Sequence, residues 1–303
     1  MKPSPPASAA AGSSRPPGVG VLFNPTLDEF VLSHGDELDH LAVIPDRTWV
    51  DRGPGAVPRF DDLARPGDIL EQVARRAPLV MHCVGMSICS ADVFDEPYVA
   101  QLAHWRARHG CAWASDHLSF SRIGAGHEHN AAMALPSPYD RELLALLVPR
   151  VRAVQDRLGC RFLLENNVYY FDYPRQELSE PEFLNALTQR TGCGLLLDLH
   201  NLHTNALNHR FDPLGFLSSL DLGSVVEIHL AGGVEMMGFH TDSHTGAVPD
   251  AVWELLRFVA PRAPALRGVT FEFHDSSWPL LRTEGVRAQL QRARDIVSPA
   301  TVV

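Results

Sequence analysis

Lysine is almost absent from this chain: Lys2 is the only one among 303 residues. The formal net charge is -10 and the isoelectric point is near 5.8. A nucleic-acid-binding protein needs Lys and Arg clustered along the path of the phosphates, so we expect no nucleic-acid partner. An isomerase of the aldose type generally uses a lysine in its cleft, and this composition disfavours that reaction.

Long hydrophobic runs are missing as well. No stretch of about 18 apolar residues occurs, which predicts that nothing in the chain spans a membrane. Residues 1–17 are rich in Pro, Ala and Ser and lack the apolar core of a signal peptide. We therefore expect this segment to be a disordered tail.

Cysteines are few, and their spacing does not pair them. The five positions are 83, 89, 111, 160 and 193, without the spacing of a zinc ribbon. The last three each start a predicted strand and are expected to be small buried hydrophobes. Cys83 and Cys89 lie close to His82 in the sequence and are therefore better candidates for a functional role than the other three. This cysteine usage is typical of a reducing compartment, so we expect a cytoplasmic protein.

Several short catalytic motifs are absent too. Gly18-Val-Gly20 and Gly232-Gly233 are too short for a dinucleotide fingerprint, and no Gly-Lys-Ser or Gly-Lys-Thr phosphate loop occurs. The Gly-X-Ser-X-Gly turn of the serine hydrolases is also missing.

One pattern recurs several times along the chain: a short apolar run that ends in a histidine or a carboxylate. The clearest run is Gly-Cys-Gly-Leu-Leu-Leu-Asp at 192–198, followed by Leu199, His200 and Asn201. Similar runs end at His82, Asp116-His117, Glu165-Asn166, His229 and Glu272.

Together with two further apolar runs near the start of the chain, these six make eight predicted strands, which alternate strictly with eight segments of helical periodicity and so indicate a parallel α/β barrel. The predicted strands are 18–23, 41–44, 78–82, 111–115, 161–164, the run ending at Asp198, 224–228 and 268–271. The predicted helices are 28–37, 66–76, 96–109, 141–158, 181–190, 212–220, 251–260 and 284–296. We predict a single (β/α)8 TIM barrel domain over residues 18–298.

Two loops are candidates for contact with a substrate. Residues 47–60 form a long segment after the second strand, and such loops often bind substrates, although an ordinary surface excursion is an equal alternative. Residues 124–130 form a second loop, in which His127 and His129 are expected to be solvated or to cover a cleft.

In TIM barrels the chemistry lies at the carboxyl ends of the strands. The side chains expected there are His82, His117, Glu165, Asp198, His229 and Glu272, with Asp242 and His244 from the loop after the seventh strand. One of His200 and Asn201 should add a ligand, and Asn201 is favoured because it shares a face with Asp198 if a helical turn begins there. These are too many ligands for one ion, so we expect two or three ions that share bridging carboxylates.

A supporting role is expected for several other polar residues. Asp116 and Glu227 are interpreted as satisfied core acids or caps, with Glu227 facing away from His229. Either Asp116 or His117 is the inward residue of its pair. Possible supporting or substrate-contacting residues are His200, Asn166, Asp46, Arg47 and His274.

Six short sequence motifs, in this order along the chain, resemble those of a known family. They are His82-Cys-Val-Gly-Met-Ser87, Ser115-Asp-His-Leu-Ser119, Leu163-Leu-Glu-Asn166, Thr191-Gly-Cys-Gly-Leu-Leu-Leu-Asp198, Glu227-Ile-His-Leu-Ala-Gly232 and Asp242-Ser-His244. The chain resembles the multinuclear non-haem iron-dependent oxidative enzymes, which include the methanobactin-biosynthesis oxidase. That family lies within the xylose-isomerase-like superfamily of TIM barrels.

The resemblance implies a barrel that holds two or three irons, as mixed Fe(II) and Fe(III), and uses dioxygen to modify a residue, often Cys, of a ribosomally made precursor peptide. It implies a separate partner protein that binds the leader of this peptide. Carried over by position, the nine ligands would be His82, His117, Glu165, Asp198, Asn201, His229, Asp242, His244 and Glu272. The chain departs from many members at Val43-Ile-Pro-Asp46, where they have Glu-Val-His-Ser-Glu-Asn.

Two other metal-dependent functions remain as alternatives. The same ligands suit zinc, and clustered zinc ions could hydrolyse a phosphodiester, as in the apurinic-site endonucleases. A sugar-isomerase-like enzyme with a divalent metal is the other alternative, against which the missing lysine argues.

Overall fold

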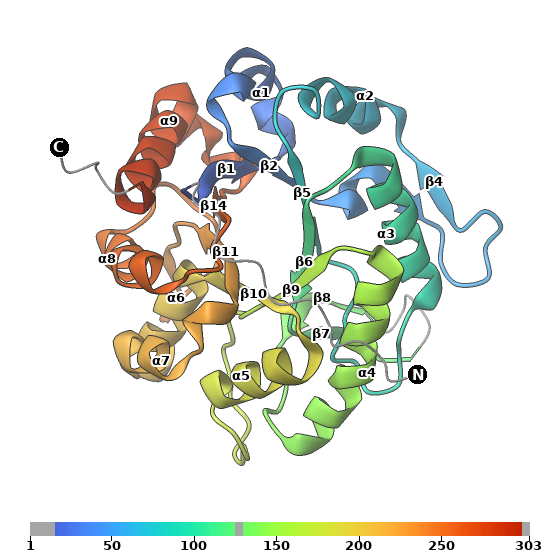
Figure 1. The fold of residues 1–303 in the computed structure, drawn as a ribbon, viewed down its shortest axis with the longest axis vertical. Helices are drawn as coiled ribbons and strands as arrows, with labels where there is room; N and C mark the ends of the chain where they lie inside the picture. Colours follow the sequence, from blue (N-terminus) through green and yellow to red (C-terminus); the bar gives the residue numbers. More distant parts are fainter. Residues whose placement is uncertain (1–15, 125–129, 299–303) are drawn as a thin grey trace, which may run out of the picture.

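The computed structural model of the protein describes residues 16–124 and 130–298, and the fold is a closed barrel of eight parallel strands ringed by helices (Figure 1). The predicted TIM barrel is therefore confirmed. Residues 1–15 of the expected tail lie outside the described residues, as do His127 and His129.

The barrel closes because each strand pairs in parallel with a neighbour on both sides. The order around the barrel is β1-β14-β11-β10-β9-β6-β5-β2, and β2 pairs with β1 again. The strands are β1 (Gly18–Leu22), β2 (His40–Val43), β5 (Leu79–Cys83), β6 (Trp113–His117), β9 (Arg161–Glu165), β10 (Gly194–Asp198), β11 (Val225–Leu230) and β14 (Gly268–Phe271). The register places His117 beside Glu165 and Asp198 beside His229.

The outer helices form where the sequence has amphipathic periodicity and capping residues. In α4, for example, Leu144, Leu147, Val151 and Val154 recur at helical spacing and are almost fully buried. The helices are α1 (Asp28–His34), α2 (Ala64–Val73), α3 (Glu96–His109), α4 (Arg141–Leu158), α5 (Glu180–Thr191), α6 (Leu199–His209), α7 (Pro213–Ser219), α8 (Asp250–Val259) and α9 (Trp278–Val297). Short 3-10 helices include η1 (Pro25–Leu27), η2 (Gly35–Glu37), η3 (Pro45–Thr48), η5 (Leu222–Ser224), η6 (Ala260–Arg262) and η7 (Asp275–Ser277).

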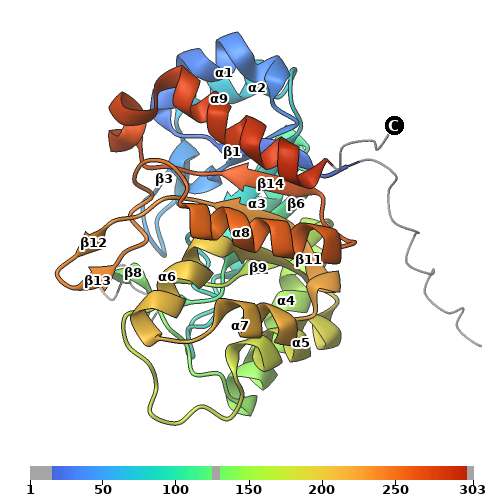
Figure 2. The same cartoon turned by 90° about the vertical axis from the view of Figure 1, so that its left-hand side faces the viewer.

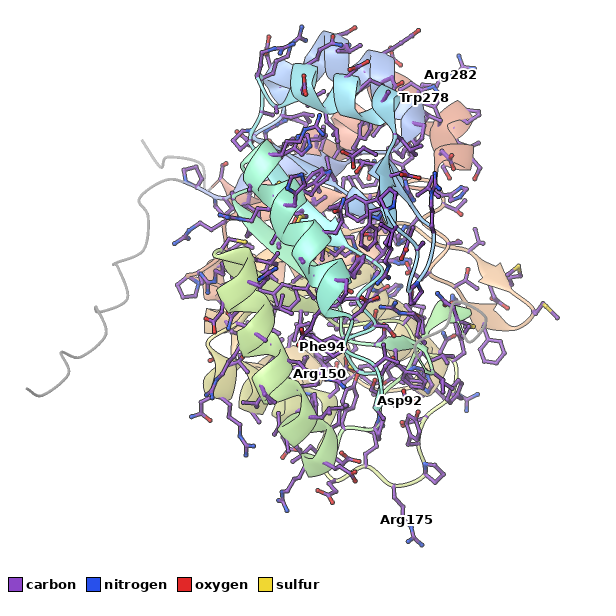
Figure 3. The ribbon with its side chains drawn as sticks, turned by 90° about the vertical axis from the view of Figure 1, so that its right-hand side faces the viewer. Asp92, Phe94, Arg150, Arg175, Trp278 and Arg282 are labelled. Atoms are coloured by element: carbon purple, nitrogen blue, oxygen red, sulfur yellow. The ribbon has the colours of Figure 1, made fainter. Side chains whose placement is uncertain are left out.

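Two helices differ from the sequence prediction. Helix α6 was expected only as a possible turn, yet it runs for 11 residues and is capped by the Asp198 side chain, which accepts a hydrogen bond from Asn201 N. Helix α9 starts before the predicted residue 284, but Arg282 has a φ of 49° and breaks it there. Trp278 and Arg282 mark the first piece of this helix in Figure 3.

Three antiparallel hairpins follow barrel strands at their carboxyl ends. They are β3 (Trp49–Asp51) with β4 (Phe60–Asp62), β7 (Phe120–Arg122) with β8 (Asn130–Leu135), and β12 (Glu235–Met236) with β13 (Phe239–His240). The long segment predicted at 47–60 is thus largely the first hairpin. In Figure 2 the β12–β13 hairpin and β8 project from the same end of the barrel.

Helix α4 also fixes the segment that follows β5. The Arg150 guanidinium donates to the carbonyls of Ile88, Ser90 and Ala91 and lies 5.7 Å from the ring centroid of Phe94 (Figure 3). These contacts tie the loop between β5 and α3 to the outside of the barrel.

Below its carboxyl end the interior of the barrel is filled mainly by apolar side chains. Trp113 packs against one inner cluster of Leu22, Ala42, Ile44 and Val80, and also against a second of Leu163, Leu196 and Val226. His40, Glu227 and Thr270 are buried polar side chains at this depth, and they form hydrogen bonds with one another and with Trp113. Among the described helices, none combines the length and the apolar character that crossing a membrane requires.

Candidate metal centre

Six neighbouring strands of the barrel each deliver one ligand-type side chain to the same end. These side chains are His82 on β5, His117 on β6, Glu165 on β9, Asp198 on β10, His229 on β11 and Glu272 directly after β14. All except His117 are buried. The structure therefore brings together residues that lie up to 190 positions apart (82 to 272) in the sequence.

The first group consists of His82, His117 and Glu165. Glu165 Oε2 lies 3.6 Å from His82 Nε2 and 3.5 Å from His117 Nε2. His82 Nδ1 lies 3.0 Å from the Ser115 hydroxyl, whose own hydrogen is directed to the carbonyl of Met81. His82 Nδ1 therefore donates to Ser115, which leaves Nε2 free of a proton and facing Glu165.

The second group shares Glu165 and adds Asp198, His229 and Glu272. One ligand atom from each of the four lies within 4.8 Å of all the others, and all four residues are buried. Among the described residues, no hydrogen-bond partner is found for Glu165 Oε2, Asp198 Oδ2 or His229 Nδ1. Buried polar atoms are rarely left in this condition, so these atoms fit metal ligands.

The third group shares Glu272 and adds Asp242, His244 and His200. Asp242 Oδ1 lies 2.8 Å from His244 Nε2 and 3.3 Å from His200 Nδ1, while His244 Nε2 lies 3.3 Å from Glu272 Oε1. His200 is thus not a surface residue: the first turn of α6 buries it against this group. From sequence spacing, His200 was the alternative to Asn201 as a ligand and otherwise a possible supporting residue, because α6 was not predicted beyond a possible turn.

The two asparagines near the second group have different roles. Asn166 bridges β9 and β10, since its amide donates to the carbonyl of Asp198 and accepts from the N–H of the same residue. Asn201 donates to the carbonyl of Asn166, and its own Oδ1 is a buried atom without a hydrogen-bond partner among the described residues. Asn201 Oδ1 is therefore available as a ligand, whereas both polar ends of the Asn166 amide are occupied.

The electrostatics of the cluster favour a bound cation. Burial raises the pKa of Glu165 and of Asp198 well above the usual carboxyl range, and neighbouring carboxylates add to the effect. Burial would lower the pKa of His244, but Glu272 and Asp242 outweigh it and raise the value to about 10. Burial lowers the pKa of His117 to about 4, which keeps this imidazole neutral and able to bind a metal.

Access to the cluster is uneven. The side chains of His117, Asp242 and His244 are 27–29% exposed, whereas those of His82, Glu165 and His229 are at most 5% exposed. A cavity of about 460 Å³ meets the cluster at His117 and is lined by Trp49, Asp116 and Met133, among others. A molecule in this cavity would therefore approach the first group.

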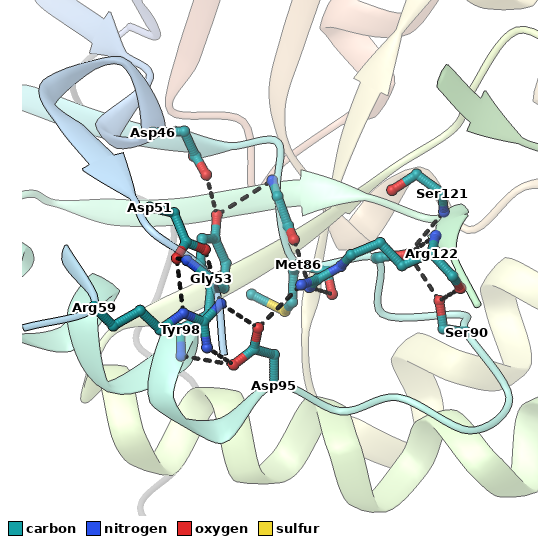
Figure 4. A network of polar contacts seen from close by, with 12 residues as sticks. Asp46, Asp51, Gly53, Arg59, Met86, Ser90, Asp95, Tyr98, Ser121 and Arg122 are labelled. Atoms are coloured by element: carbon teal, nitrogen blue, oxygen red, sulfur yellow. Dashed lines mark hydrogen bonds and ion pairs between the residues drawn. The ribbon is translucent and has the colours of Figure 1, made fainter. Parts of the chain in front are cut away.

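A polar network supports the wall of this cavity (Figure 4). Tyr98 donates to Asp46 over 2.6 Å, and Arg59 donates to both Asp51 and Asp95. Arg122 donates to Asp95 and to the carbonyls of Gly85 and Met86. The loop after β5, next to His82, is held by these contacts.

Comparison with known proteins agrees with the sequence patterns. A family model described as RiPP precursor modification enzyme MbnB/TglH/ChrH matches residues 18–298, where RiPP denotes a ribosomally synthesised and modified peptide. The chain belongs to this family. This match confirms the resemblance that was drawn from the six sequence motifs. The family model describes enzymes that modify a precursor peptide.

Relatives are similar over most of the chain. A UPF0276 protein of Anaeromyxobacter sp. (strain Fw109-5) is 38% identical over 237 residues, which are 74% of this chain and 80% of that protein. A UPF0276 protein of Neisseria gonorrhoeae is 33% identical over 264 residues, which are 86% of this chain and 89% of that protein.

Solved structures show the fold. Endonuclease IV from Thermus thermophilus has a TM-score of 0.56 at 17% identity and covers 91% of this chain and 98% of its own. D-psicose 3-epimerase with D-fructose has a TM-score of 0.58 at 10% identity, covering 92% and 99%. The IolI protein with a zinc atom has a TM-score of 0.54 at 15% identity, covering 94% and 100%.

The remaining polar residues singled out in the sequence lie at the edge of the site or away from it. Asp46 lines the cavity beside His117, whereas Arg47 lines a separate, more apolar cavity of about 260 Å³ with Phe23 and Ile44. His274 is exposed; its imidazole contacts Ser276, and only its backbone N–H reaches the carbonyl of His244.

The interpretations of the two core acids have different outcomes. Asp116 is buried and accepts from the N–H groups of Met86 and His117, as expected of a satisfied core acid. The expectation that Glu227 faces away from His229 is wrong. Residues two apart on a strand share a face, and Glu227 Oε1 lies 3.4 Å from His229 Nε2.

The cysteines do not belong to the three groups. Cys83 and Cys89 are buried, and burial raises the pKa of Cys83 well above its usual range and that of Cys89 to about 12. Cys111 and Cys193 are buried as expected, while Cys160 is only half-buried.

Proposed function

We propose that this chain is a multinuclear non-haem iron enzyme that uses dioxygen to oxidise a residue of a ribosomally made precursor peptide. Membership of a precursor-modifying family supports the peptide as the substrate class. The observation that carries the metal is the set of buried, unpartnered ligand atoms where the six strands end.

The donor set fits iron. It mixes imidazoles with carboxylates and leaves one side exposed, which suits non-haem iron with open coordination positions better than the closed sulfur-rich sites of structural zinc. Bound iron would supply the one-electron and dioxygen chemistry that protein side chains lack. The residues hold two or three ions, with Glu165 shared by the first and second groups and Glu272 by the second and third.

The nine proposed ligands divide by group. His82 and His117 bind with Glu165 in the first group, and Asp198, Asn201, His229 and Glu272 bind in the second. Asp242 and His244 bind in the third group, where His200 either adds a further nitrogen or orients Asp242. The catalytic unit is the barrel at residues 18–298.

The substrate residue enters through the cavity at His117. The volume of about 460 Å³ is large enough for one side chain and its flanking backbone. Trp49 offers an aromatic wall and is itself oriented by edge contacts with Phe60 and Tyr98. We propose that a separate protein binds the leader of the precursor and presents the reacting residue to this cavity.

The test begins with protein purified without oxygen. Elemental analysis and Mössbauer spectroscopy should find at least two irons per chain with coupled iron signals. Any short peptides encoded beside the gene are the candidates for the precursor. The enzyme should consume oxygen only when the correct precursor is present, and the mass of that peptide should change. The contrary result would be a protein that binds only zinc, which iron cannot replace, and that nicks an abasic duplex without taking up oxygen. That result would show that the chain is a phosphodiesterase instead.

A further inference from the structure

Beneath the second group lies a carboxylate that the proposed ligand set does not use. Glu227 precedes His229 by two residues on β11, and both side chains are almost fully buried inside the barrel. Leu196 on β10 is the register partner of Glu227, and Leu196 belongs to the apolar inner cluster against which Trp113 packs. A buried carboxylate is costly in such a place unless it is hydrogen-bonded, so its partners are informative.

Glu227 accepts hydrogen bonds from two side chains. Trp113 Nε1, which can only donate, lies 2.6 Å from Oε2, and the Thr270 hydroxyl donates to Oε1 over 2.6 Å. The hydrogen of Thr270 is thus committed to Glu227. Its oxygen must accept from His40 Nε2, which lies 2.8 Å away. The side chain of Glu227 is therefore an acceptor with both oxygens engaged.

The remaining neighbour of Glu227 is His229. Its Nε2 has no hydrogen-bond partner among the described residues, and the polar atom it faces is Glu227 Oε1 at 3.4 Å, a contact that is attractive only if Nε2 carries a proton. Its Nδ1 faces the opposite way, 3.6 Å from Glu272 Oε1 and 3.9 Å from Glu165 Oε1. The two nitrogens of this ring thus face different surroundings: a carboxylate below and the ligand cluster above.

We propose that Glu227 is a positioning residue for the metal centre: it holds the proton of His229 on Nε2, so that Nδ1 is the nitrogen that binds the ion of the second group. The proposal rests on the metal centre of the proposed function, but not on the identity of the metal. A carboxylate behind a ligating imidazole also fixes the ring plane and strengthens the ligand. His82 has the opposite arrangement, because its Nδ1 donates to Ser115 and its Nε2 faces the cluster.

The variant that tests this is Glu227→Gln. An amide of the same shape has one oxygen and one NH2 group, whereas Trp113 and His229 both donate to the present carboxylate. If the oxygen stays with Trp113, the NH2 group faces Thr270 and His229. Thr270 can adapt by turning its hydroxyl towards His40. His229 can adapt only by accepting at Nε2, which puts its proton on Nδ1 and blocks the ligand.

Zinc is the probe, because it is diamagnetic and needs no redox chemistry. The metal-free protein is titrated with Zn²⁺, and bound zinc is counted by elemental analysis. We expect E227Q to bind at least one zinc fewer than the wild type, or to bind it 10- to 100-fold more weakly. Thr270→Val, which perturbs the same network but keeps the carboxylate beside His229, should bind the wild-type number within about twofold affinity.

A measurement on the zinc-loaded wild type tests the proposal without relying on the folding of E227Q. In ¹⁵N-histidine NMR spectra, His229 should show a protonated Nε2 and a zinc-bound Nδ1, with the resonance assigned by its absence from His229→Ala. Coordination through Nε2, or an E227Q variant with the wild-type zinc number and affinity, would overturn the proposal. Neither result would touch the iron-dependent oxidation, which is tested separately by oxygen uptake with peptide.

Discussion

Asp198 uses its two carboxylate oxygens for different purposes. Oδ1 accepts from the N–H of Asn201 over 2.6 Å and so caps α6, while Oδ2 is buried without a hydrogen-bond partner among the described residues. The cap places His200 and Asn201 on the first turn of the helix, where both side chains are buried beside the cluster. One residue therefore links the local structure of α6 to the proposed metal binding.

Two substitutions separate these roles. Asp198→Asn keeps an oxygen for the cap but replaces the free oxygen by an NH2 group, so we expect loss of at least one ion per chain with little change in the stability of the metal-free protein. Asp198→Ala removes the cap as well and should cost about 1 kcal/mol more in the free energy of unfolding. Metal counting and urea unfolding measure both effects. An Asp198→Asn protein with its full number of ions would remove Asp198 from the ligand set.

The thiols provide a second test at the residue scale. Burial raises the pKa of Cys111 to about 12 and that of Cys193 to about 11, as it does for Cys83 and Cys89. Burial raises the pKa of Cys160 too, but Cys160 is half-buried while the other four are buried, so the native protein should react with about one equivalent of a disulfide reagent, at Cys160. All five should react in denaturant. Rapid native labelling of Cys83, found by peptide mapping, would contradict this assignment.

Single residues show how far the sequence could go. The gathering of the main proposed ligands at one end of the barrel could be predicted, because each follows an apolar run and the carboxyl ends of parallel strands meet. The position of Glu227 could have been derived too, because residues two apart on a strand share a face and His229 was expected to face inward. The register between β10 and β11 could not, since it shifts between Leu195 and Leu196. The sequence of β11 alone does not contain that irregularity in its pairing.

At the scale of elements, one ion-pair network joins three elements around the cavity at His117. Asp95 caps α3, Arg59 belongs to the β3–β4 hairpin, and Arg122 ends β7 (Figure 4). Burial alone would raise the pKa of Asp95, but the two guanidinium groups outweigh it and lower the pKa to about 2. The network therefore stabilises the folded state as long as Asp95 is ionised.

The sign of the pH dependence follows from this lowered pKa. Its contribution is complete above the unfolded value near 3.8 and is lost as the pH falls towards the folded value of about 2. Asp95→Asn keeps a capping oxygen but loses the charge, so it should destabilise the metal-free protein by about 2 kcal/mol at pH 7. The difference from the wild type should fall to about half at pH 3. Urea unfolding of both proteins at the two pH values measures it, and a difference that does not change with pH would assign the effect to packing.

The elements also differ in how well the sequence announces them. Helix α4 has a capping Asp140, a regular apolar face and Gly159 at its end, so its predicted bounds are confirmed. Helix α6 is rich in Asn and His, which have poor helix propensity. It forms because Asp198 caps it and because Leu199 and Leu202 are buried against the barrel. Such a helix depends on contacts that exist only after the chain has folded.

On the scale of the whole molecule, the proposed ions would connect most of the barrel. Their proposed ligands come from β5, β6, β9, β10, β11 and the end of β14, together with α6 and the loop after β11. The alternation of strands and helices was enough to predict the barrel, because it reflects local periodicity. Bound metal ions would add stabilising contacts between strands. Local periodicity in the sequence cannot predict these contacts.

Removal of metal should therefore lower the melting temperature of the entire barrel. A ligand at 1,000 times its dissociation constant stabilises the folded state by about 4 kcal/mol, which corresponds to an increase of roughly 6 to 7 °C in the melting temperature of a chain of this length. The measurement is thermal unfolding of the iron-loaded or zinc-loaded protein before and after treatment with a chelator, with re-addition of metal to show that the shift is reversible.

Two histidines that lie next to each other in the fold give the matched comparison. His244→Ala removes a proposed ligand of the third group and should lose part of the shift. His274→Ala should keep the full shift, because the imidazole of His274 is exposed and its contact with the segment of His244 is made by the backbone N–H, which alanine retains. Equal shifts in the two variants would mean that His244 does not bind an ion. No shift in the wild type would mean that metal binding is not coupled to the stability of the barrel.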